Sequence, residues 1–212
     1  MADEPPTTAR QRQAAETRLQ LLAAAGDVFE ERGYQSTSVG AITDRAQTAH
    51  GTFYLYFKNK EDVFCQVMET VIVGELASAS ALPDGMDPRD ATDLVIRGYV
   101  SAYSQRVGLW RAVLEGMLQS DRVRELWLDL RRDFIHRIAA VLEDECRRGR
   151  TRPLDPLMTA HALGSMTEWF TFMHFEMHEP PGAAGELDPG NDHAVGVLVD
   201  LWRQAFYGQV TQ

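Results

Sequence analysis

Apolar residues recur along most of this chain with the three-to-four-residue spacing of amphipathic helices. The first such segment covers residues 14–32, and Gly33 follows it as a residue that ends helices. The next two segments, at 37–46 and 49–57, are short and are separated by only a brief gap. Short helices joined so closely indicate a helix-turn-helix arrangement near the N-terminus.

Polar residues at the predicted helix starts can supply the N-caps. We expect Thr37 to cap the second helix, Thr48 the third and Asn59 the fourth, because their side-chain oxygens can accept the free N–H groups of a first turn. Glu61 and Asp62 follow Asn59, in the part of a helix where the macrodipole favours acids. The pattern therefore predicts a fourth helix that begins directly after the helix-turn-helix segment.

The rest of the chain has the same helical periodicity, and no stretch alternates as a strand does. Segments rich in Pro and Gly at 82–88 and 179–192 are predicted loops, and Pro153 with Pro156 marks a further break. The predicted helices of this part cover 59–71, 89–105, 108–119, 121–149, 155–178 and 192–207. We therefore expect an all-α fold.

The last predicted helix is apolar around most of its circumference. Leu198, Leu201, Trp202 and Ala205 form one stripe, and further apolar residues extend it. A helix of this kind has to be buried on two sides. One side would face the core of the protein, and the other would face a partner.

The net charge of the chain becomes informative about its partners when the N-terminal and C-terminal segments are counted separately. The 212 residues have a formal net charge of -10, which taken whole argues against a nucleic acid or an anionic membrane as partner. Residues 1–60, however, hold seven basic and seven acidic residues, whereas 61–212 hold 14 and 24. Both lysines of the chain, Lys58 and Lys60, lie at the end of the first segment. The N-terminal segment is therefore compatible with contact to DNA.

Several classes of protein are not indicated by the sequence. Two cysteines, Cys65 and Cys146, are too few for a disulfide framework or a thiolate zinc cage, and they suit a reducing cytoplasm. No apolar run is long enough to span a bilayer, and the polar N-terminus lacks the apolar core of a signal peptide. No nucleotide-binding, serine-hydrolase or zinc-protease motif is present. We therefore expect a cytoplasmic protein with no catalytic residue, no cofactor and no membrane contact.

The segment from Thr37 to Asp62, TSVGAITDRAQTAHGTFYLYFKNKED, resembles the DNA-binding signature of TetR-family transcriptional regulators. The resemblance implies an N-terminal three-helix helix-turn-helix DNA-binding domain and a larger C-terminal helical domain for ligand binding and dimerisation. We expect a disordered tail at 1–13, the DNA-binding domain at 14–60 and the second domain at 61–212. The positions that carry the resemblance are Ile42, Ala46, Gly51, Phe53, Tyr54, Tyr56, Phe57 and Lys60.

A recognition helix needs one apolar face that anchors it and one small, polar face that enters the major groove. Phe53 and Phe57, four residues apart, supply the anchor. The residues predicted to face the groove are Ala49, His50, Gly51 and Thr52. The resemblance implies phosphate contacts at Thr37, Thr48, Tyr54, Tyr56 and Lys60.

One departure from the family pattern lies in the turn. Gln47 and Thr48 stand where the family usually has a glycine and an aliphatic residue. A left-handed residue other than glycine costs about 1 kcal/mol, so Gln47 either carries that strain or the turn differs. Upstream of the motif, Arg10, Arg12 and Arg18 either reach DNA or belong to a solvated tail.

The resemblance also implies a ligand cavity and a dimer interface in the second domain. In the family, the last two helices of each subunit pair with their copies, which places Phe170, Leu198 and Trp202 in or near the interface. Aromatic and methionine residues on the helices that would enclose a cavity are either its lining or ordinary core. These residues are Trp110, Met117, Trp127, Phe134, Met166, Trp169 and Met173.

A histidine pair near the second predicted loop raises the question of a metal. His174 and His178 are four residues apart, which suits metal coordination on one helix face. Histidines that precede a loop are commonly solvated, however, and nothing in the sequence places Cys146 or His161 nearby. We expect no metal site.

Two hypotheses of function follow. In the first, the chain is a sequence-specific repressor whose homodimer binds a palindromic operator in double-stranded DNA and is released by a small hydrophobic or amphipathic effector. In the second, it is a dimeric small-molecule-binding protein that no longer binds DNA. The acidic net charge and Gln47 are the features that allow the second hypothesis.

Overall fold

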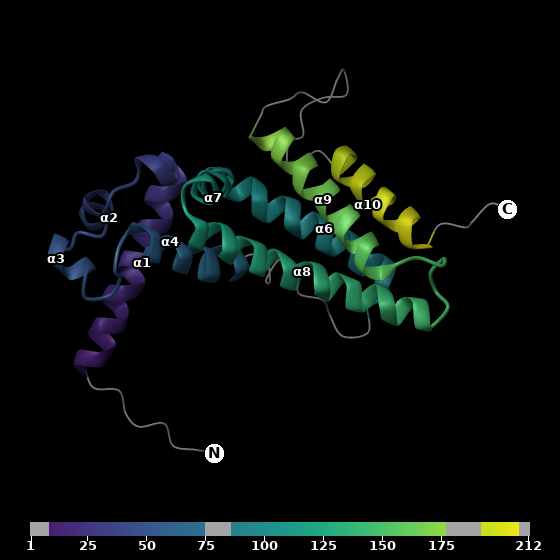
Figure 1. The fold of residues 1–212 in the computed structure, drawn as a ribbon, viewed down its shortest axis with the longest axis horizontal. Coiled ribbons are helices and arrows are strands. Elements are labelled where there is room, and N and C mark those ends of the chain that lie inside the picture. Colours follow the sequence, from purple (N-terminus) through teal and green to yellow (C-terminus); the bar gives the residue numbers. More distant parts are fainter. Residues whose placement is uncertain (1–8, 75–85, 177–191, 208–212) are drawn as a thin grey trace, which may run out of the picture. The chain divides into compact units, whose positions relative to one another are not determined.

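The computed structural model describes residues 9–74, 86–176 and 192–207 of the chain. Within these ranges every regular element is helical and none is a strand, which confirms the all-α prediction. In chain order the elements are α1 (Ala9–Ser36), α2 (Val39–Arg45), α3 (His50–Phe53), α4 (Lys60–Val67), the π-helical turn η1 (Met68–Ile72), α6 (Pro88–Gln105), α7 (Val107–Gln119), α8 (Asp121–Arg147), α9 (Pro156–Phe175) and α10 (Asp192–Tyr207) (Figure 1).

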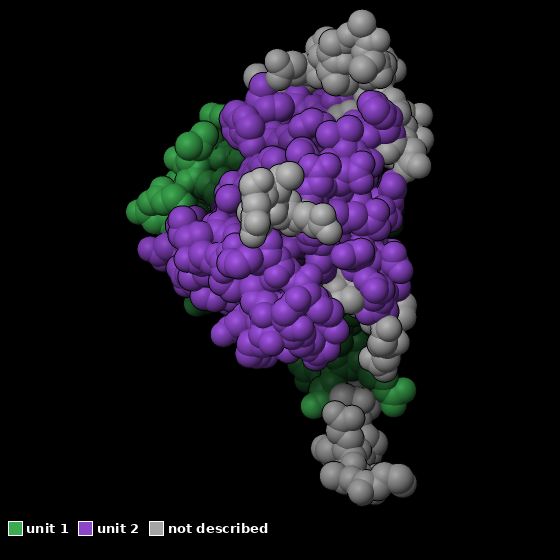
Figure 2. Space-filling model, turned by 90° about the vertical axis from the view of Figure 1, so that its right-hand side faces the viewer, with its two compact units in different colours: residues 1–72, 108–124 green, residues 73–107, 125–212 purple. Residues whose placement is uncertain are grey.

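The chain divides into two compact units, which are coloured separately in Figure 2. The first unit contains residues 1–72 and 108–124, so it combines the N-terminal helices with nearly all of α7 and the first residues of α8. The second unit contains residues 73–107 and 125–212, and includes α6, the rest of α8, α9 and α10. The compact N-terminal unit therefore takes in more of the chain than the helix-turn-helix segment itself.

An aromatic cluster forms the core of the first unit. The Phe64 ring lies 4.5 Å from the Phe29 ring and 4.8 Å from the Tyr34 ring, measured between centroids. Gly116 of α7 packs directly on this cluster, since a Cβ atom added to it would lie 3.0 Å from Phe64. The small residue lets the α7 backbone approach the core of the N-terminal helices.

Two further contacts fix α7 to the end of α1. A Cβ atom on Gly108 would lie only 2.1 Å from the carbonyl oxygen of Glu30, so the two backbones touch at this point. The backbone N–H of Gln35 donates to Glu115 Oε2 at 3.0 Å. These contacts explain why α7 belongs to the same compact unit as the N-terminal helices.

The predicted helix starts are partly correct. Asn59 caps α4 as expected, because its side chain accepts a backbone N–H at 2.8 Å. The cap of α2, however, is Ser38, whose hydroxyl accepts from the Ala41 N–H at 3.2 Å. The prediction of Thr37 as this cap is wrong, because Thr37 is buried and its hydroxyl donates to the Gly33 carbonyl at 2.7 Å.

Helix α1 differs from the predicted helix at both ends. It begins at Ala9, so residues 9–13 of the expected tail are helical. Gly33 has a positive φ of 75° and interrupts the helical geometry as predicted, but the element continues beyond it to Ser36. The ends of α8 and α9 lie within a few residues of their predicted positions.

In the second unit, α10 packs against α6 and α9, and α6 also contacts α9. Two buried or half-buried polar contacts add to this packing. The Trp202 indole N–H of α10 donates to Thr167 Oγ1 of α9 at 2.8 Å. Arg131 of α8 and Glu168 of α9 form an ion pair with Nε and Oε2 2.9 Å apart. The four helices thus form one packed group that can enclose a cavity.

Candidate DNA-binding surface and ligand cavity

Two phenylalanines anchor α3 to the first unit. Phe53 and Phe57 are both buried, and their ring centroids are 5.4 Å apart, which confirms the predicted apolar face. Helix α3 itself is a single turn that ends at Phe53, and residues 54–56 continue as turns, so it is shorter than the predicted helix at 49–57.

The residues predicted to read the groove lie together on the outer side of this turn. Ala49, His50 and Gly51 are exposed, and Thr52 is half-buried. The Tyr54 side chain, 53% exposed, continues the surface, with its ring centroid 5.5 Å from that of His50. One exposed turn therefore presents an imidazole, a hydroxyl and a phenol beside a glycine.

Gly51 is not required by packing within the described chain. A Cβ atom added there would meet no other atom within 4 Å, and the backbone φ is not in the left-handed region. The buried glycine Gly116, by contrast, has Phe64 at 3.0 Å. The open space at Gly51 leaves room for close approach by a partner from outside.

The turn before α3 keeps its geometry despite Gln47. Gln47 has a φ of 52°, so it carries the left-handed strain that the sequence left open. Its N–H donates to the Asp44 carbonyl at 3.2 Å, and the Thr48 N–H donates to the Thr43 carbonyl at 3.0 Å. This pair of bonds is the Schellman motif, with Gln47 at the position that glycine usually occupies.

The hydroxyl residues expected to contact phosphates are not equally accessible. Tyr54 is exposed and Tyr56 is half-buried, whereas Thr37 is buried and bonded internally. The Thr48 hydroxyl is also buried and has no hydrogen-bond partner among the described residues. The prediction that Thr48 caps α3 is wrong, because Ala49 occupies the N-cap position and provides no side-chain hydrogen bond.

Lys60 has partners inside the first unit. Its ammonium donates to the carbonyls of Tyr34 at 2.8 Å and Gln35 at 3.3 Å, at the end of α1. The nitrogen also lies 4.5 Å from the centroid of the Tyr34 ring. Partial burial lowers the pKa of Lys60, and the charge of Glu115 opposes this effect. The lysine therefore caps the C-terminal end of α1. The predicted phosphate contact of Lys60 would be made in addition to these internal bonds.

Two arginines of the N-terminal segment are likewise engaged within the unit. Arg18 donates to the Gln66 side chain and lies 5.6 Å from the centroid of the Phe57 ring. Arg45 pairs with Glu31 at 2.5 Å, and this pair lowers the pKa of the Glu31 carboxyl. Both arginines thus support the position of the helix-turn-helix segment.

Leu55 is an exposed residue that the sequence analysis did not identify. Its side chain is 78% exposed, directly after α3. Its position in the sequence could have indicated this exposure. Leu55 lies two residues from Phe53 and two from Phe57, and residues at that spacing do not share a face with the buried pair. An exposed leucine beside the α3 turn is available for apolar contact with a partner.

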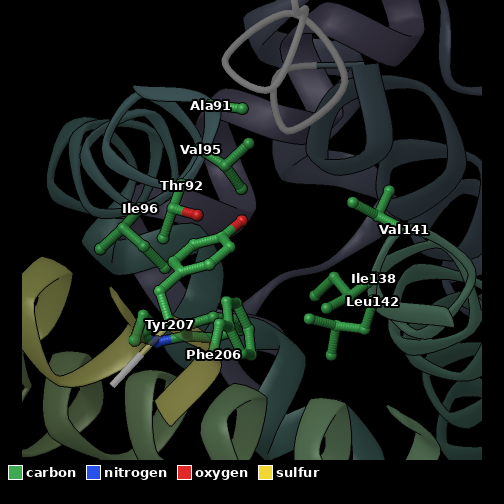
Figure 3. A pocket seen from close by; sticks show the side chains of 10 residues that line it. Ala91, Thr92, Val95, Ile96, Ile138, Val141, Leu142, Phe206 and Tyr207 are labelled. Carbon is green, nitrogen blue, oxygen red and sulfur yellow. The ribbon is translucent and has the colours of Figure 1, made fainter. Parts of the chain in front are cut away.

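The second unit contains two adjoining apolar cavities. The outer one has a volume of about 100 Å³ and lies between α6, α8 and α10 (Figure 3). In Figure 3, Phe206 and Tyr207 lie between the side chains of α6 and those of α8. The residues that line the outer cavity are Ala91, Thr92, Val95, Ile96, Ile138, Val141, Leu142, Trp202, Phe206 and Tyr207.

The inner cavity has a volume of about 20 Å³, and apolar atoms form its exposed wall. Val95, Ile96, Ile138 and Trp202 line both cavities, so the two adjoin. The remaining residues that line the inner cavity are Tyr99, Phe134, Gly164, Thr167 and Glu168.

Of the residues predicted to bind a ligand, Phe134 lines the inner cavity. Trp110 and Met117 belong to the first unit, where Trp110 is buried. Trp169 is 63% exposed on α9. Neither cavity is lined by the other predicted residues, Trp127, Met166 and Met173. The predicted lining was aromatic and methionine-rich, whereas most of the side chains that line the outer cavity are aliphatic, and several of them belong to α6.

The residues predicted at a dimer interface also differ in exposure. Leu198 and Trp202 are buried within their own unit, and Phe170 is half-buried. The exposed apolar residues of α10 are instead Val197, at 45%, and Leu201, at 43%, which are four residues apart. The outward face of α10 is therefore formed by Val197 and Leu201, each of which precedes by one residue the predicted interface residues Leu198 and Trp202.

The described residues contain no group of three His, Cys, Asp or Glu side chains that could hold a metal ion. Within the pair considered from the sequence, the His174 ring packs edge-on against Phe175, and His178 lies outside the described residues. None of the helices in the described ranges is both long and apolar enough to cross a membrane.

Two family models match the chain. Residues 21–67 match the family described as bacterial regulatory proteins, tetR family. Residues 89–208, more than half of the chain, match the C-terminal domain of the transcriptional regulator EthR. The first match covers the surface around α3, and the second covers both cavities.

Individual proteins are similar over most of the chain. The HTH-type transcriptional regulator EthR of Mycolicibacterium smegmatis is 27% identical over 191 residues, which cover 89% of this chain and 85% of that protein. A TetR-like transcriptional regulator from Rhodococcus sp. RHA1 has a TM-score of 0.64 at 26% identity, covering 89% of this chain and 95% of that one. GusR of Salmonella enterica shares the fold, with a TM-score of 0.73 at 18% identity, covering 93% and 97%.

Proposed function

We propose a function from one premise: this chain belongs to the TetR family of bacterial regulatory proteins. It is a DNA-binding transcriptional regulator with a C-terminal ligand-binding domain. We propose further that it is a repressor, and that a small hydrophobic or amphipathic effector in the cavity of the second unit releases it from its operator. Because its partner is DNA, we place the protein in the cytoplasm.

The exposed turn around α3 carries this proposal. Phe53 and Phe57 fix the turn from below, while His50, Gly51 and Thr52 are left at the surface. His50 can donate to a guanine acceptor, and the Thr52 methyl can contact a thymine methyl in the major groove. Tyr54 is available to hold the backbone phosphates, which position the helix without reading sequence.

A palindromic operator requires a dimer with two copies of this turn. We propose that the outward faces of α9 and α10 form the interface, with Val197 and Leu201 of α10 and Trp169 of α9 as exposed apolar contributors. In sedimentation measurements, Leu201→Glu should then shift the protein from dimer to monomer. Leu118→Glu, at an exposed leucine of α7, is the matched control and should leave the dimer intact.

Release by an effector requires that the ligand prefers one of two arrangements of the dimer. An effector that favours a spacing of the two recognition turns other than that of the operator lowers DNA affinity by its difference in affinity for the two states. The chain passes from one unit to the other at three places: after Ile72, at the α6–α7 junction and within α8 after Arg124. Arg106 at that junction has non-helical backbone angles, which makes it a natural place for a small rotation.

The alternative, a small-molecule-binding protein that has lost DNA binding, was allowed by Gln47 in the turn. The Schellman hydrogen bonds around Gln47 remove this support, because the turn keeps the geometry that a recognition helix needs. We therefore favour the repressor.

Footprinting on the DNA upstream of the chain's own coding sequence tests the proposal. The repressor should protect two half-sites whose centres are about 34–36 Å apart or a multiple of that spacing. His50→Ala combined with Thr52→Ala should remove the protection without changing the sedimentation of the dimer. A dimeric, folded protein that protects no sequence at any concentration would contradict the proposal and favour the small-molecule-binding alternative.

A further inference from the structure

Three basic residues lie in the helix-turn-helix segment 37–62, and two of them are engaged inside the first unit. The Arg45 guanidinium pairs with Glu31 at 2.5 Å and lies 3.8 Å from the Asp27 carboxylate. The Lys60 ammonium donates to two backbone carbonyls at the end of α1, so at most one of its three N–H groups is left for an outside partner. Much of the positive charge of this segment is therefore already used within the protein.

Lys58 is the third of these residues, and its ammonium has no hydrogen-bond or ion-pair partner among the described residues. Its side chain is exposed, and it directly follows Phe57, the buried anchor of the α3 turn. It is four residues from Tyr54, so the two Cα atoms are at most about 15 Å apart. An uncommitted cation thus lies beside the surface that the α3 turn exposes.

The backbone at Lys58 is held in place, although its side chain is not. The Lys58 N–H donates to Asp62 Oδ2 at 2.9 Å, and Asp62 Oδ1 accepts from the Arg122 guanidinium at 3.1 Å. The Asp62 N–H in turn donates to Asn59 Oδ1 at 2.8 Å. One carboxylate therefore ties the segment before α4 to the first turn of α8. A contact made from a fixed backbone loses less conformational freedom than one made from a mobile chain.

A phosphate is the ligand that suits this cation. A lysine ammonium binds phosphate as a compact point charge, and such a contact positions a protein on DNA without reading bases. We propose that Lys58 supplies a further phosphate contact of the recognition turn, and that it carries much of the salt-dependent attraction of segment 37–62 to the DNA backbone. The inference rests on the proposed function, because it takes the turn around α3 as the DNA-contact surface.

The variant Lys58→Gln removes the charge and keeps a long polar side chain. Fluorescence anisotropy with a labelled duplex from the upstream region, at several salt concentrations, gives the slope of log K against log salt. The slope should become shallower by about 1 for each Lys58 on the DNA, and so by about 2 for a dimer on a palindrome. Affinity should fall at least about fivefold at about 50 mM salt, and less at about 200 mM. An unchanged slope overturns the proposal.

Two further variants separate a local contact from an effect of net charge. Lys58→Arg keeps the charge and should restore the slope, whereas Arg111→Gln makes the same charge change at an exposed residue of α7 and should leave the slope unchanged. An equal change of slope in Arg111→Gln overturns the proposal. Thermal unfolding of Lys58→Gln should match that of the original protein. A loss of the fold would show that the side chain is needed inside the unit, and this too overturns the proposal.

A scrambled duplex of the same length tests the kind of contact. Because phosphates carry no sequence information, Lys58→Gln should weaken binding to both duplexes by factors that agree within about threefold. A loss confined to the upstream duplex would make Lys58 a base-reading residue and overturn the phosphate contact.

The proposed function can fail separately in the same titrations. If the unaltered protein binds both duplexes equally, it is not sequence-specific, but the effect of Lys58→Gln on the slope is still measured. If the unaltered protein binds the upstream duplex preferentially and Lys58→Gln leaves the slope unchanged, only the inference on Lys58 is contradicted. An unaltered protein that binds neither duplex contradicts both.

Discussion

Arg122 donates from its guanidinium to Asp62 Oδ1 at 3.1 Å, which joins the first turn of α8 to the first turn of α4. Next to this pair, the Ser120 hydroxyl donates to Glu61 Oε2 at 2.6 Å. The acids predicted to stabilise the start of α4 therefore also hold the corner between α7 and α8. The helix after the DNA-binding segment is fixed at this corner within the first unit.

Arg122→Ala should lower the free energy of unfolding by up to about 1 kcal/mol at neutral pH, the range of a largely exposed ion pair. Burial raises the pKa of Asp62, but hydrogen bonds from the Lys58 N–H and from Arg122 outweigh it and leave the pKa lowered. A carboxyl with a lowered folded-state pKa stabilises the protein above its unfolded pKa and loses this contribution as the pH falls through the folded value. Urea unfolding should therefore show that Arg122→Ala is less stable than the original protein at neutral pH, and that the two free energies of unfolding become equal in acid.

The control for this pair is Arg132→Ala, because Arg132 pairs with Asp129 one turn away on the exposed side of α8. Its unfolding free energy should stay within about 0.5 kcal/mol of the original at every pH. A loss in Arg122→Ala that persists unchanged at a pH where Asp62 is protonated would refute the assigned interaction.

Gly51→Ala should separate DNA binding from stability. Its added methyl group meets nothing within the described chain, and alanine is the better helix former, so stability should stay equal or rise by up to about 1 kcal/mol. Affinity for operator DNA should fall at least about tenfold, because the methyl group enters the space of the groove. Thermal unfolding and DNA titration of the same sample measure both effects.

Gly108→Ala is the matched control variant, and we expect it to lose stability where Gly51→Ala does not. Its Cβ atom would collide with the Glu30 carbonyl, so the variant should be destabilised by about 1–3 kcal/mol. Normal DNA binding by Gly51→Ala would contradict the assignment of the α3 turn as the contact surface. A loss of stability as large as that of Gly108→Ala would contradict the open space around Gly51.

Gln47→Gly should stabilise the protein by about 0.5–1 kcal/mol, because glycine adopts the left-handed conformation at φ 52° without strain. Gln47→Ala keeps a Cβ atom and should leave the unfolding free energy almost unchanged. Chemical denaturation of the three proteins gives the comparison, and equal stability of the glycine and alanine variants would disprove strain at this residue.

Thr167→Val removes the acceptor of the Trp202 indole and leaves its N–H buried without that partner. The variant should lose about 1–3 kcal/mol of stability. Trp202→Phe removes the indole donor but also loses packing contacts, so its effect on stability is not due to the hydrogen bond alone. A double-mutant cycle of the two substitutions separates the energy of the bond from that of the packing. A coupling energy near zero between the two substitutions would mean that this bond does not hold α10 to α9.

The sequence predicted the helices and the anchor of the recognition turn because these depend on local periodicity. The spacing of Phe53 and Phe57 led directly to the buried pair, and the acids after Asn59 led to the start of α4. The caps at Thr37 and Thr48 were wrong. Thr37 and Ser38 are adjacent polar residues that compete for one cap, and the burial of Thr37 decides between them. Helix α3 begins one residue later than predicted, so Ala49 occupies its N-cap position.

The cavity and the corner at α7 could not be predicted in the same way. Lys60 and Arg122 owe their partners to helices far away along the chain, and no local pattern identifies such contacts. Aliphatic side chains on α6 and α8 form the cavity wall, and they have the same periodicity as ordinary core residues. On α10, periodicity identified an apolar helix but not which stripe faces its own unit.

The most direct test of the account is fluorescence anisotropy of the full-length protein with a labelled duplex from its own upstream region and with a scrambled duplex of the same length. We predict tight binding to the first, at least about 1,000-fold tighter than to the second, that weakens at least about tenfold between about 50 and 200 mM salt. Equal, weak binding to both duplexes by a folded protein would contradict the central claim that this chain is a sequence-specific DNA-binding regulator.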